Sequence, residues 1–317
     1  MKKIKFLIRY NDFPFGIYIL LILMVATFLI FTKGTVSPMH LLNIARAASP
    51  LGIVAIGQTL TLLVAGLDLS LGTQMSLVNL VLASMMNGNS DKTFVAILIS
   101  LTLCAFIGMV NGIVITKFKM QPFLVTMAMS LIIQGGYYIY TKGIARGSIA
   151  REIRYLSEGW IGNIPVALIL WIALWLICSV ILKKTVYGQK LYMAGANKKA
   201  SDLSGFRSDR IIISAYVLAA LLAGIAGILL SAYIGVASVD IGNSYTLDSV
   251  AASVIGGTSF LGGVGSLEGT FPGVLIITIL SSLMTIIGIS EAGKFICQGT
   301  IIAVMVALSQ LRTKERR

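Results

Sequence analysis

Polar side chains that can exchange hydrogen bonds with a neutral solute lie inside, or near the ends of, otherwise apolar stretches. The amides and hydroxyls of this kind are Gln58, Asn79, Asn111, Thr126 and Gln134. Amides both donate and accept hydrogen bonds, which suits a hydroxyl-rich ligand. Each of them also has a plainer interpretation, because polar residues commonly hydrogen-bond one helix to another in membrane bundles. As a group they predict a path for a small polar solute.

Two carboxylates, Asp68 and Asp248, also lie in apolar surroundings. Burying a carboxylate costs several kcal/mol unless it is paired or capped. We expect Asp68 to begin a helix and accept backbone N–H groups there, in a turn that includes Ser70 and Gly72. We favour that role over direct contact with a solute, and we expect Asp248 to cap a later span in the same way. Acidic groups within the spans are too few for a carboxylate proton relay.

Residues for catalysis or metal binding are scarce. His40 is the single histidine, and Cys104, Cys178 and Cys297 lie in apolar runs at unrelated spacings. We interpret the cysteines as small core residues and predict neither a metal site nor a catalytic set. No G-x-x-x-x-G-K-[ST] motif occurs, so we expect no ATP bound through a P-loop and no cofactor held by this chain.

The composition predicts an all-α integral membrane protein. Hydrophobic residues make up 57% of the chain and charged residues 12%, whereas soluble domains carry roughly 25% charged residues. At about 20 residues for each span, residues 1–317 form a single transmembrane domain of about ten helices. The expected spans are 15–32, 41–66, 69–87, 93–115, 122–140, 164–182, 211–235, 248–261, 267–289 and 294–311.

Glycine-containing breaks interrupt two of the apolar stretches. The first is VAGLDLSLG, Val64–Gly72, and the second is VIGGTSFLGGVGS, Val254–Ser266, which contains Gly256, Gly257, Gly262 and Gly263. Broken helices at matching places in two halves point to a solute path, and such breaks must face protein or water rather than lipid. We therefore predict re-entrant segments there, and related halves at about 41–140 and 211–311.

Basic residues set the predicted orientation. Seventeen of the 25 Lys and Arg residues fall on one side when both termini are placed in the cytoplasm, as the positive-inside bias requires. The net charge of +13 is thereby explained by membrane flanks, and we reject nucleic acid as a partner. One outer loop, 141–163, is also basic. Its Arg146, Arg151 and Arg154 either meet acidic patches on a docking protein or contact lipid headgroups and the neighbouring Glu152 and Glu158.

The segment Leu191–Arg210 predicts a short helix outside the membrane. Asn197 is a suitable N-cap and Gly205 a suitable stop, with a two-turn helix over Lys198–Ser204. A short capped helix in a cytoplasmic loop is a docking element for a partner, although a solvated loop is the plainer alternative. The docking residues we propose are Asn197, Lys198, Lys199, Ala200, Asp202, Leu203 and Gly205.

Three motifs in order carry a family likeness. They are Ala65–Thr73, similar to GGIDLSVGS; Gly195–Phe206, similar to GGNPEAARLSGI; and Ala251–Thr270, similar to AxxVIGGTSLFGGxGSxxGT. From about Leu41 to Leu308 the chain resembles the permease subunits of bacterial ABC importers of the ribose/xylose/autoinducer-2 class. It departs from the pattern at Ala65, where glycine is usual, and at Lys198 and Lys199, where Pro-Glu is usual.

The resemblance implies an inner-membrane permease for a monosaccharide. It implies a second permease copy or a sister permease, an ATPase that binds ATP and Mg on the cytoplasmic face, and an extracytoplasmic solute-binding protein. The short helix would be the coupling helix in a groove of the ATPase, and the reversed charge at Lys198 and Lys199 hints at a more acidic groove. Nucleosides, autoinducer-2 and branched-chain amino acids stay open as solutes, and an ion-coupled secondary transporter and a membrane enzyme as remoter classes.

Overall fold

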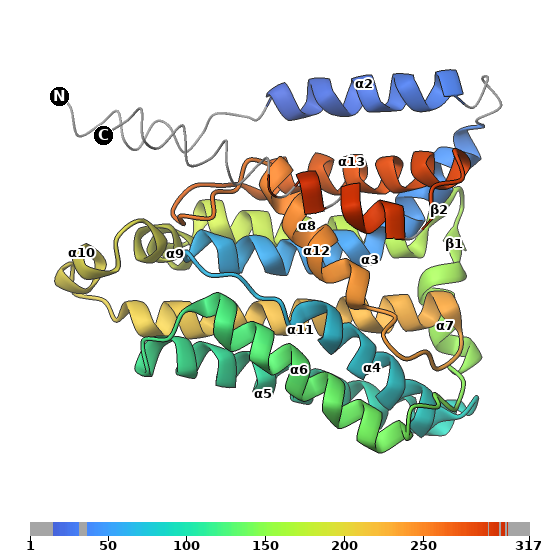
Figure 1. The fold of residues 1–317 in the computed structure, drawn as a ribbon, viewed down its shortest axis with the longest axis horizontal. Helices are drawn as coiled ribbons and strands as arrows, with labels where there is room; N and C mark the ends of the chain where they lie inside the picture. Colours follow the sequence, from blue (N-terminus) through green and yellow to red (C-terminus); the bar gives the residue numbers. More distant parts are fainter. Residues whose placement is uncertain (1–14, 32–36, 291, 298, 302, 304–317) are drawn as a thin grey trace.

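The computed structural model describes residues 15–31, 37–290, 292–297, 299–301 and 303, and it is almost entirely helical (Figure 1). The helices are α2 (Phe15–Phe31), α3 (Pro38–Leu63), α4 (Leu71–Met86), α5 (Thr93–Lys117), α6 (Pro122–Thr141), α7 (Arg151–Glu158), α8 (Val166–Lys184), α9 (Val186–Ala196), α10 (Lys198–Leu203), α11 (Ser208–Ile234), α12 (Asn243–Ile255) and α13 (Leu267–Ile286). A one-turn 3₁₀ helix, η2 (Ser90–Lys92), precedes α5, and a small hairpin joins β1 (Trp160–Ile161) to β2 (Ile164–Pro165). The expected all-α class is confirmed.

Six helices among the described residues are long and apolar enough to cross a membrane: α3, α5 together with η2, α6, α8, α11 and α13. The apolar helices α2 and α4 are shorter, with 17 and 16 residues. Most of the expected span 294–311 and the start of the chain lie outside the described residues. Ten spans therefore stay a prediction.

The eighth expected span, 248–261, is misplaced. Helix α12 occupies Asn243–Ile255 instead, with Gly242 before its first residue and Gly256 after its last. Asp240 adopts a left-handed φ of 62° just upstream, which turns the chain into the helix early. The prediction that Asp248 caps this span is thus wrong, because Asp248 lies in its second turn.

Helix α11 occupies the centre of the bundle, in contact with α3, α4 and α5 (Figure 1). Glycines allow these close approaches. A Cβ at Gly108 of α5 would lie 2.5 Å from the Tyr216 carbonyl oxygen, and a Cβ at Gly112 would lie 2.8 Å from the Ile213 Cα. Backbone contact at small residues is the usual basis of tight helix packing in membranes. The close packing of α5 against α11 therefore depends on these two glycines.

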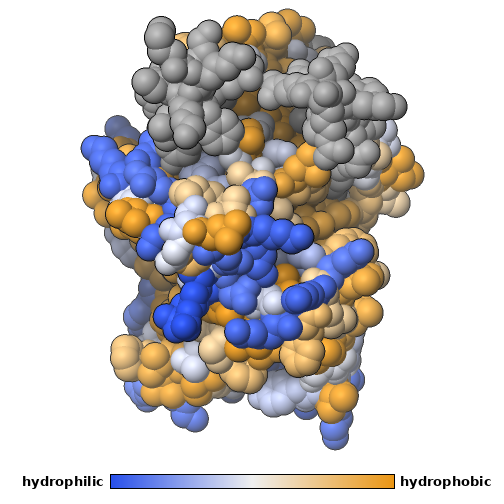
Figure 2. Space-filling view, turned by 90° about the vertical axis from the view of Figure 1, so that its left-hand side faces the viewer, coloured by the Kyte–Doolittle hydropathy of each residue, from blue (hydrophilic) through white to orange (hydrophobic). Residues whose placement is uncertain are grey.

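The two ends of the bundle carry different elements. Helices α9 and α10 lie at one end, and α7 with the β1–β2 hairpin lies at the other (Figure 1). Figure 2 looks onto the α9–α10 end and shows hydrophilic residues gathered across it. Along the flanks, large apolar side chains such as Phe94, Phe106 and Ile139 are exposed, which is the surface expected to face lipid.

Candidate functional site

The first break folds into a turn held by Asp68. Its buried Oδ1 accepts hydrogen bonds from the backbone N–H of Ser70 at 2.9 Å and from the Ser70 hydroxyl at 2.6 Å. The expected bond from a carboxylate to a backbone N–H is present. However, α4 begins at Leu71 with Ser70 as its N-cap residue, so Asp68 precedes the helix rather than beginning it.

Ser70 is the centre of this network. Its Oγ also accepts hydrogen bonds from Asn111 Nδ2 on α5 at 3.1 Å and from Gln74 Nε2 on α4 at 2.9 Å. Thr126 on α6 accepts a bond from the backbone N–H of Leu69 at 3.1 Å. The structure therefore brings four predicted residues, Asp68, Ser70, Asn111 and Thr126, around one turn, and together with Gln74 they tie α4, α5 and α6 to the break.

The other predicted amides lie elsewhere. Asn79 donates to Ser231 Oγ and to the Val236 carbonyl, and accepts from the backbone N–H of Ser238, so it fixes the end of α11. Gln134 donates to Asp240 Oδ1 at 3.2 Å. Gln58 is fully buried in α3, and among the described residues its side-chain oxygen and nitrogen have no hydrogen-bond partner.

Asp240 is an anchor that no local sequence pattern indicates. Besides Gln134, the hydroxyls of Tyr137 and Tyr138 on α6 donate to its carboxylate. Burial raises its pKa, but these hydrogen bonds outweigh burial and hold the pKa below its ordinary value. The contacts join the α11–α12 loop to the end of α6, and Gln134 is therefore part of a structural link rather than of the first break.

The second break, residues 256–266, is a compact loop between α12 and α13. The backbone N–H of Ser259 donates to the Val264 carbonyl at 2.9 Å, and Ser266 caps α13. The start of α13 touches the end of α12 so closely that a Cβ at Gly269 would lie 1.9 Å from the Gly256 oxygen. A Cβ at Gly256, Gly262 or Gly263 would also lie 2.6–2.7 Å from a neighbouring atom, so three of the four predicted glycines lie in a close-packed return of the chain, and the fourth, Gly257, has a positive φ of 87°.

The two breaks meet each other and the end of α9. Gly263 donates its backbone N–H to the Leu63 carbonyl at 2.9 Å, which joins the second break to the end of α3. Gly195 of α9 fits between them, because a Cβ there would lie 1.8 Å from the Leu63 oxygen and 2.8 Å from the Gly263 nitrogen. Tyr192 of α9 also donates to the Gly265 carbonyl at 2.8 Å. We call Leu63, Gly195 and Gly263 the glycine junction.

The predicted short helix follows the junction directly. Helix α10 spans Lys198–Leu203, the Asn197 side chain accepts a bond from the backbone N–H of Ala200 at 3.0 Å, and Gly205 has a φ of +90°. The expected N-cap and stop are confirmed. Lys198 pairs with Asp209 at 2.7 Å, while Lys199 and Ala200 are exposed.

Asp202 fastens the far end of this helix. Its Oδ1 accepts a hydrogen bond from the backbone N–H of Ser208 at 2.9 Å, and that bond holds the pKa of Asp202 below its ordinary value. The loop from α10 back to α11 is thereby closed. Helix α10 is therefore a fixed protrusion and not a loose solvated loop.

The three arginines of the basic loop at the opposite end differ in whether they are ion-paired or exposed. Arg154 forms an ion pair with Glu158 one turn along α7, which is the local pairing considered above. Arg146 and Arg151 are exposed. The three arginines are therefore not one uniform patch.

Two functional candidates had weak sequence signals. Gly195 lay within the recognised Gly195–Phe206 motif but received no role, because its tight contacts are with residues more than 60 positions away in the chain. Lys294 received no role from the sequence, yet it lines a cavity with Asp248. Among the described residues, no group of three or more His, Cys, Asp or Glu could hold a metal ion.

Comparisons with known proteins agree with this architecture. Residues 40–305 match the family described as "Branched-chain amino acid transport system / permease component". The chain is 34% identical to the ribose import permease protein RbsC of Bacillus subtilis, over 95% of this chain and 92% of the relative. It is 31% identical to RbsC of Haemophilus influenzae, over 98% of this chain and 96% of the relative.

A galactose permease is similar to the same extent. The chain is 30% identical to the galactose/methyl galactoside import permease protein MglC of Salmonella typhimurium, over 95% of each chain. No solved structure matches the chain. With a family match over most of its length and six membrane-capable helices, this chain is a multi-pass membrane protein that belongs to the branched-chain amino acid transport system permease family.

Proposed function

We propose that the chain is the membrane-spanning permease subunit of an ABC importer and forms the path for a small polar solute, most favourably a monosaccharide. Its relatives RbsC and MglC are, by name, a ribose and a galactose import permease. The observation that carries the proposal is the glycine junction, where both breaks contact the helix that leads into α10. ATP and Mg belong to a separate ATPase in this proposal, and the permease itself binds no cofactor.

The proposed topology has about ten spans with both termini in the cytoplasm of a bacterial inner membrane. The α9–α10 end, with its exposed lysines, is then cytoplasmic, in keeping with the positive-inside bias. The breaks at 64–70 and 256–266 are re-entrant segments of two related halves. A second copy of the chain, or a sister permease, completes the path.

Coupling in this proposal is mechanical. The ATPase holds α10, and closure of the ATPase on ATP displaces α10 together with α9. Because Gly195 contacts the Leu63 oxygen and the Gly263 nitrogen without an intervening side chain, a displacement of α9 moves the end of α3, where the first break begins, together with the second break. Packed interiors transmit such shifts because they are close to incompressible.

Leu203 is the expected anchor of the ATPase. It is the last residue of α10, and 89% of its surface is exposed at the hydrophilic end of the bundle. A large apolar side chain protruding from a polar rim is typical of a residue that fills a partner's pocket. We expect Leu203→Ser to weaken co-purification of the ATPase by roughly tenfold or more, since such anchors contribute about 2 kcal/mol or more.

A matched control is available in α9, at the same end of the bundle (Figure 1). Val186, the first residue of α9, is 63% exposed but precedes the proposed contact, so Val186→Ser should leave ATPase binding unchanged. Equal retention of the ATPase by wild type and Leu203→Ser would show that α10 is not the docking element.

The opposite end is the proposed docking surface for the extracytoplasmic binding protein. Arg146 and Arg151 are exposed there and suited to acidic partners, because charge complementarity aids encounter and register. Arg154 contributes less in this proposal, because Glu158 already pairs with it.

Reconstitution tests the function. The permease alone in liposomes should accumulate no solute, whatever proton or sodium gradient is applied. With its ATPase, its binding protein and ATP, it should accumulate labelled monosaccharide. A panel containing a nucleoside, autoinducer-2 and leucine decides among the open solutes. Concentrative uptake by the lone permease would replace the proposal with an ion-coupled transporter.

A further inference from the structure

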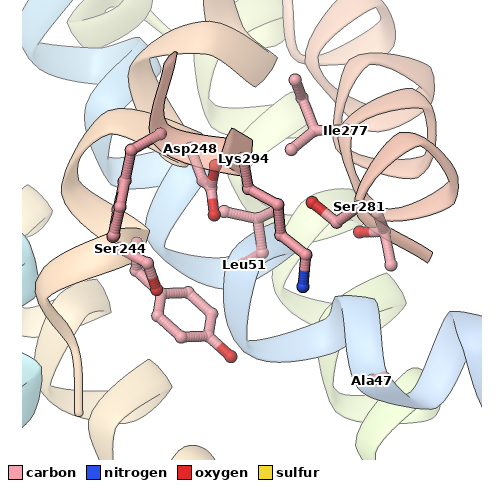
Figure 3. A pocket seen from close by; sticks show the side chains of 10 residues that line it. Ala47, Leu51, Ser244, Asp248, Ile277, Ser281 and Lys294 are labelled. Atoms are coloured by element: carbon pink, nitrogen blue, oxygen red, sulfur yellow. The ribbon is translucent and has the colours of Figure 1, made fainter. Parts of the chain in front are cut away.

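A cavity of about 210 Å³ lies between α3, α12, α13 and the helical segment 292–297 (Figure 3). Its polar lining is unusual for a site among apolar helices. The residues that line it are Ala47, Leu51, Ser244, Tyr245, Asp248, Ile277, Thr278, Ser281, Lys294 and Phe295. Pockets for drug-sized ligands measure roughly 300–1,000 Å³, so this one suits a smaller molecule.

Among the described residues that line this cavity, Asp248 and Lys294 carry charge. Asp248 comes from α12 and Lys294 from segment 292–297, and Figure 3 shows both pointing into the same space. Ionisable groups within membrane helices are costly and mark solute or ion pathways. The charges of this carboxylate and this ammonium group are opposite, so among the described lining residues they balance each other when a neutral solute enters.

The cavity lies in the half of the bundle away from α10. Ala47 falls in the first half of α3 and Leu51 at its middle, and α3 ends at the glycine junction. Thr278 and Ser281 fall in the second half of α13, which starts beside that junction. In the proposed topology this is the extracytoplasmic half. A solute released by a binding protein therefore reaches this cavity before it reaches the breaks.

We propose that this cavity is a monosaccharide-contact site on the receiving side of the path, an inference that rests on the proposed function. Asp248 accepts and Lys294 donates hydrogen bonds to sugar hydroxyls, and the hydroxyls of Ser244 and Ser281 exchange further ones. The Tyr245 ring supplies an apolar face for the C–H side of the sugar. Such a combination of few polar groups and an aromatic wall is usual in small-ligand sites.

The first test measures transport by the complete complex in liposomes. Asp248→Asn and Lys294→Gln should each lower monosaccharide uptake roughly tenfold, the effect of losing one charge-assisted hydrogen bond. Lys294→Arg, which keeps the charge, should retain more activity than Lys294→Gln. Lys92→Gln, which changes an exposed charge of η2 outside the cavity, should leave uptake unchanged.

The second test needs no transport. In a chain with Cys104, Cys178 and Cys297 replaced by serine, Ser281→Cys is labelled with a water-soluble thiol reagent. Monosaccharide in excess should slow labelling at 281 but not at Thr285→Cys, which is exposed one turn further along α13. Normal uptake by both cavity variants, or labelling at 281 that sugar does not slow, would overturn the proposal.

The outcomes separate this inference from the function on which it rests. If wild type with its partners imports a monosaccharide while the cavity variants behave as wild type, only the cavity assignment fails. If wild type imports no monosaccharide, the proposed function fails first. If leucine, and not sugar, protects residue 281 from labelling, the cavity binds a zwitterionic amino acid. The proposal that it binds a monosaccharide would then be wrong.

Discussion

Replacing Gly195 with valine should reduce solute uptake by about tenfold or more, because it inserts a side chain where two backbone segments touch. A Cβ at this position would lie 1.8 Å from the Leu63 oxygen, far inside van der Waals contact. Neither Leu63 nor Gly263 can yield by rotating a side chain, since the contacting atoms belong to the backbone. The end of α9 must therefore separate from the breaks.

ATP hydrolysis distinguishes loss of coupling from loss of assembly. We expect Gly195→Val to retain the ATPase, because α10 and its anchor Leu203 are unchanged, while hydrolysis no longer drives uptake. Gly136→Ala is the matched control, because Gly136 is a helical glycine of α6 with open space around it. Uptake by Gly195→Val at the wild-type rate would show that the glycine junction does not transmit motion.

Replacing Asp68 with alanine should destabilise the permease and stop uptake. The change leaves the backbone N–H and the hydroxyl of Ser70 without their buried acceptor, at a cost of about 1–3 kcal/mol for each unsatisfied group. The Ser70 hydroxyl oxygen also accepts hydrogen bonds from the amides of Asn111 and Gln74, so the disturbance reaches α4 and α5. We expect the thermal midpoint of the purified permease to fall by roughly 5 °C or more.

The conservative variant separates support from solute contact. Asp68→Asn keeps an oxygen that can accept from Ser70, so it should recover most of the thermal stability and much of the uptake. Asp91→Ala removes an exposed carboxylate in η2 and should change neither quantity. If Asp68→Asn is as stable as wild type but has lost uptake, Asp68 contacts the solute and the supporting role assigned to it is incomplete.

The sequence was most informative where local chemistry decides the outcome. Helix α10 was predicted nearly to the residue because its signals are local: Asn197 accepts an N–H three residues ahead, and Gly205 adopts a positive φ that other residues resist. The first break was likewise placed correctly. The helix after the break begins at Leu71, whereas the sequence had predicted a start at Asp68. The two positions were confused because a carboxylate can accept a bond from a backbone N–H in a turn as well as at a helix cap.

Predictions that needed long-range contacts fared less well. Aspartate is a residue type that often caps helices, but Asp248 lies inside α12. The helix begins earlier because the chain turns at Asp240 and Gly242, and Gln134 of α6 holds Asp240 in that turn. Asn79 and Gln134 were grouped with Asn111 and Thr126 as polar residues of apolar stretches. The structure assigns them to separate links, because helix faces and crossing points decide which amides meet.

By itself the sequence determined that this is a helical membrane protein, where its chain is broken, and which short helix protrudes from it. Those properties follow from hydropathy summed along a segment, from glycine backbone freedom and from hydrogen bonds over a few residues. Only the tertiary structure decided that both breaks meet at Gly195, and that Asp248 and Lys294 line one cavity. Such meetings depend on how helices far apart in the chain pack, and local residue patterns do not encode that packing.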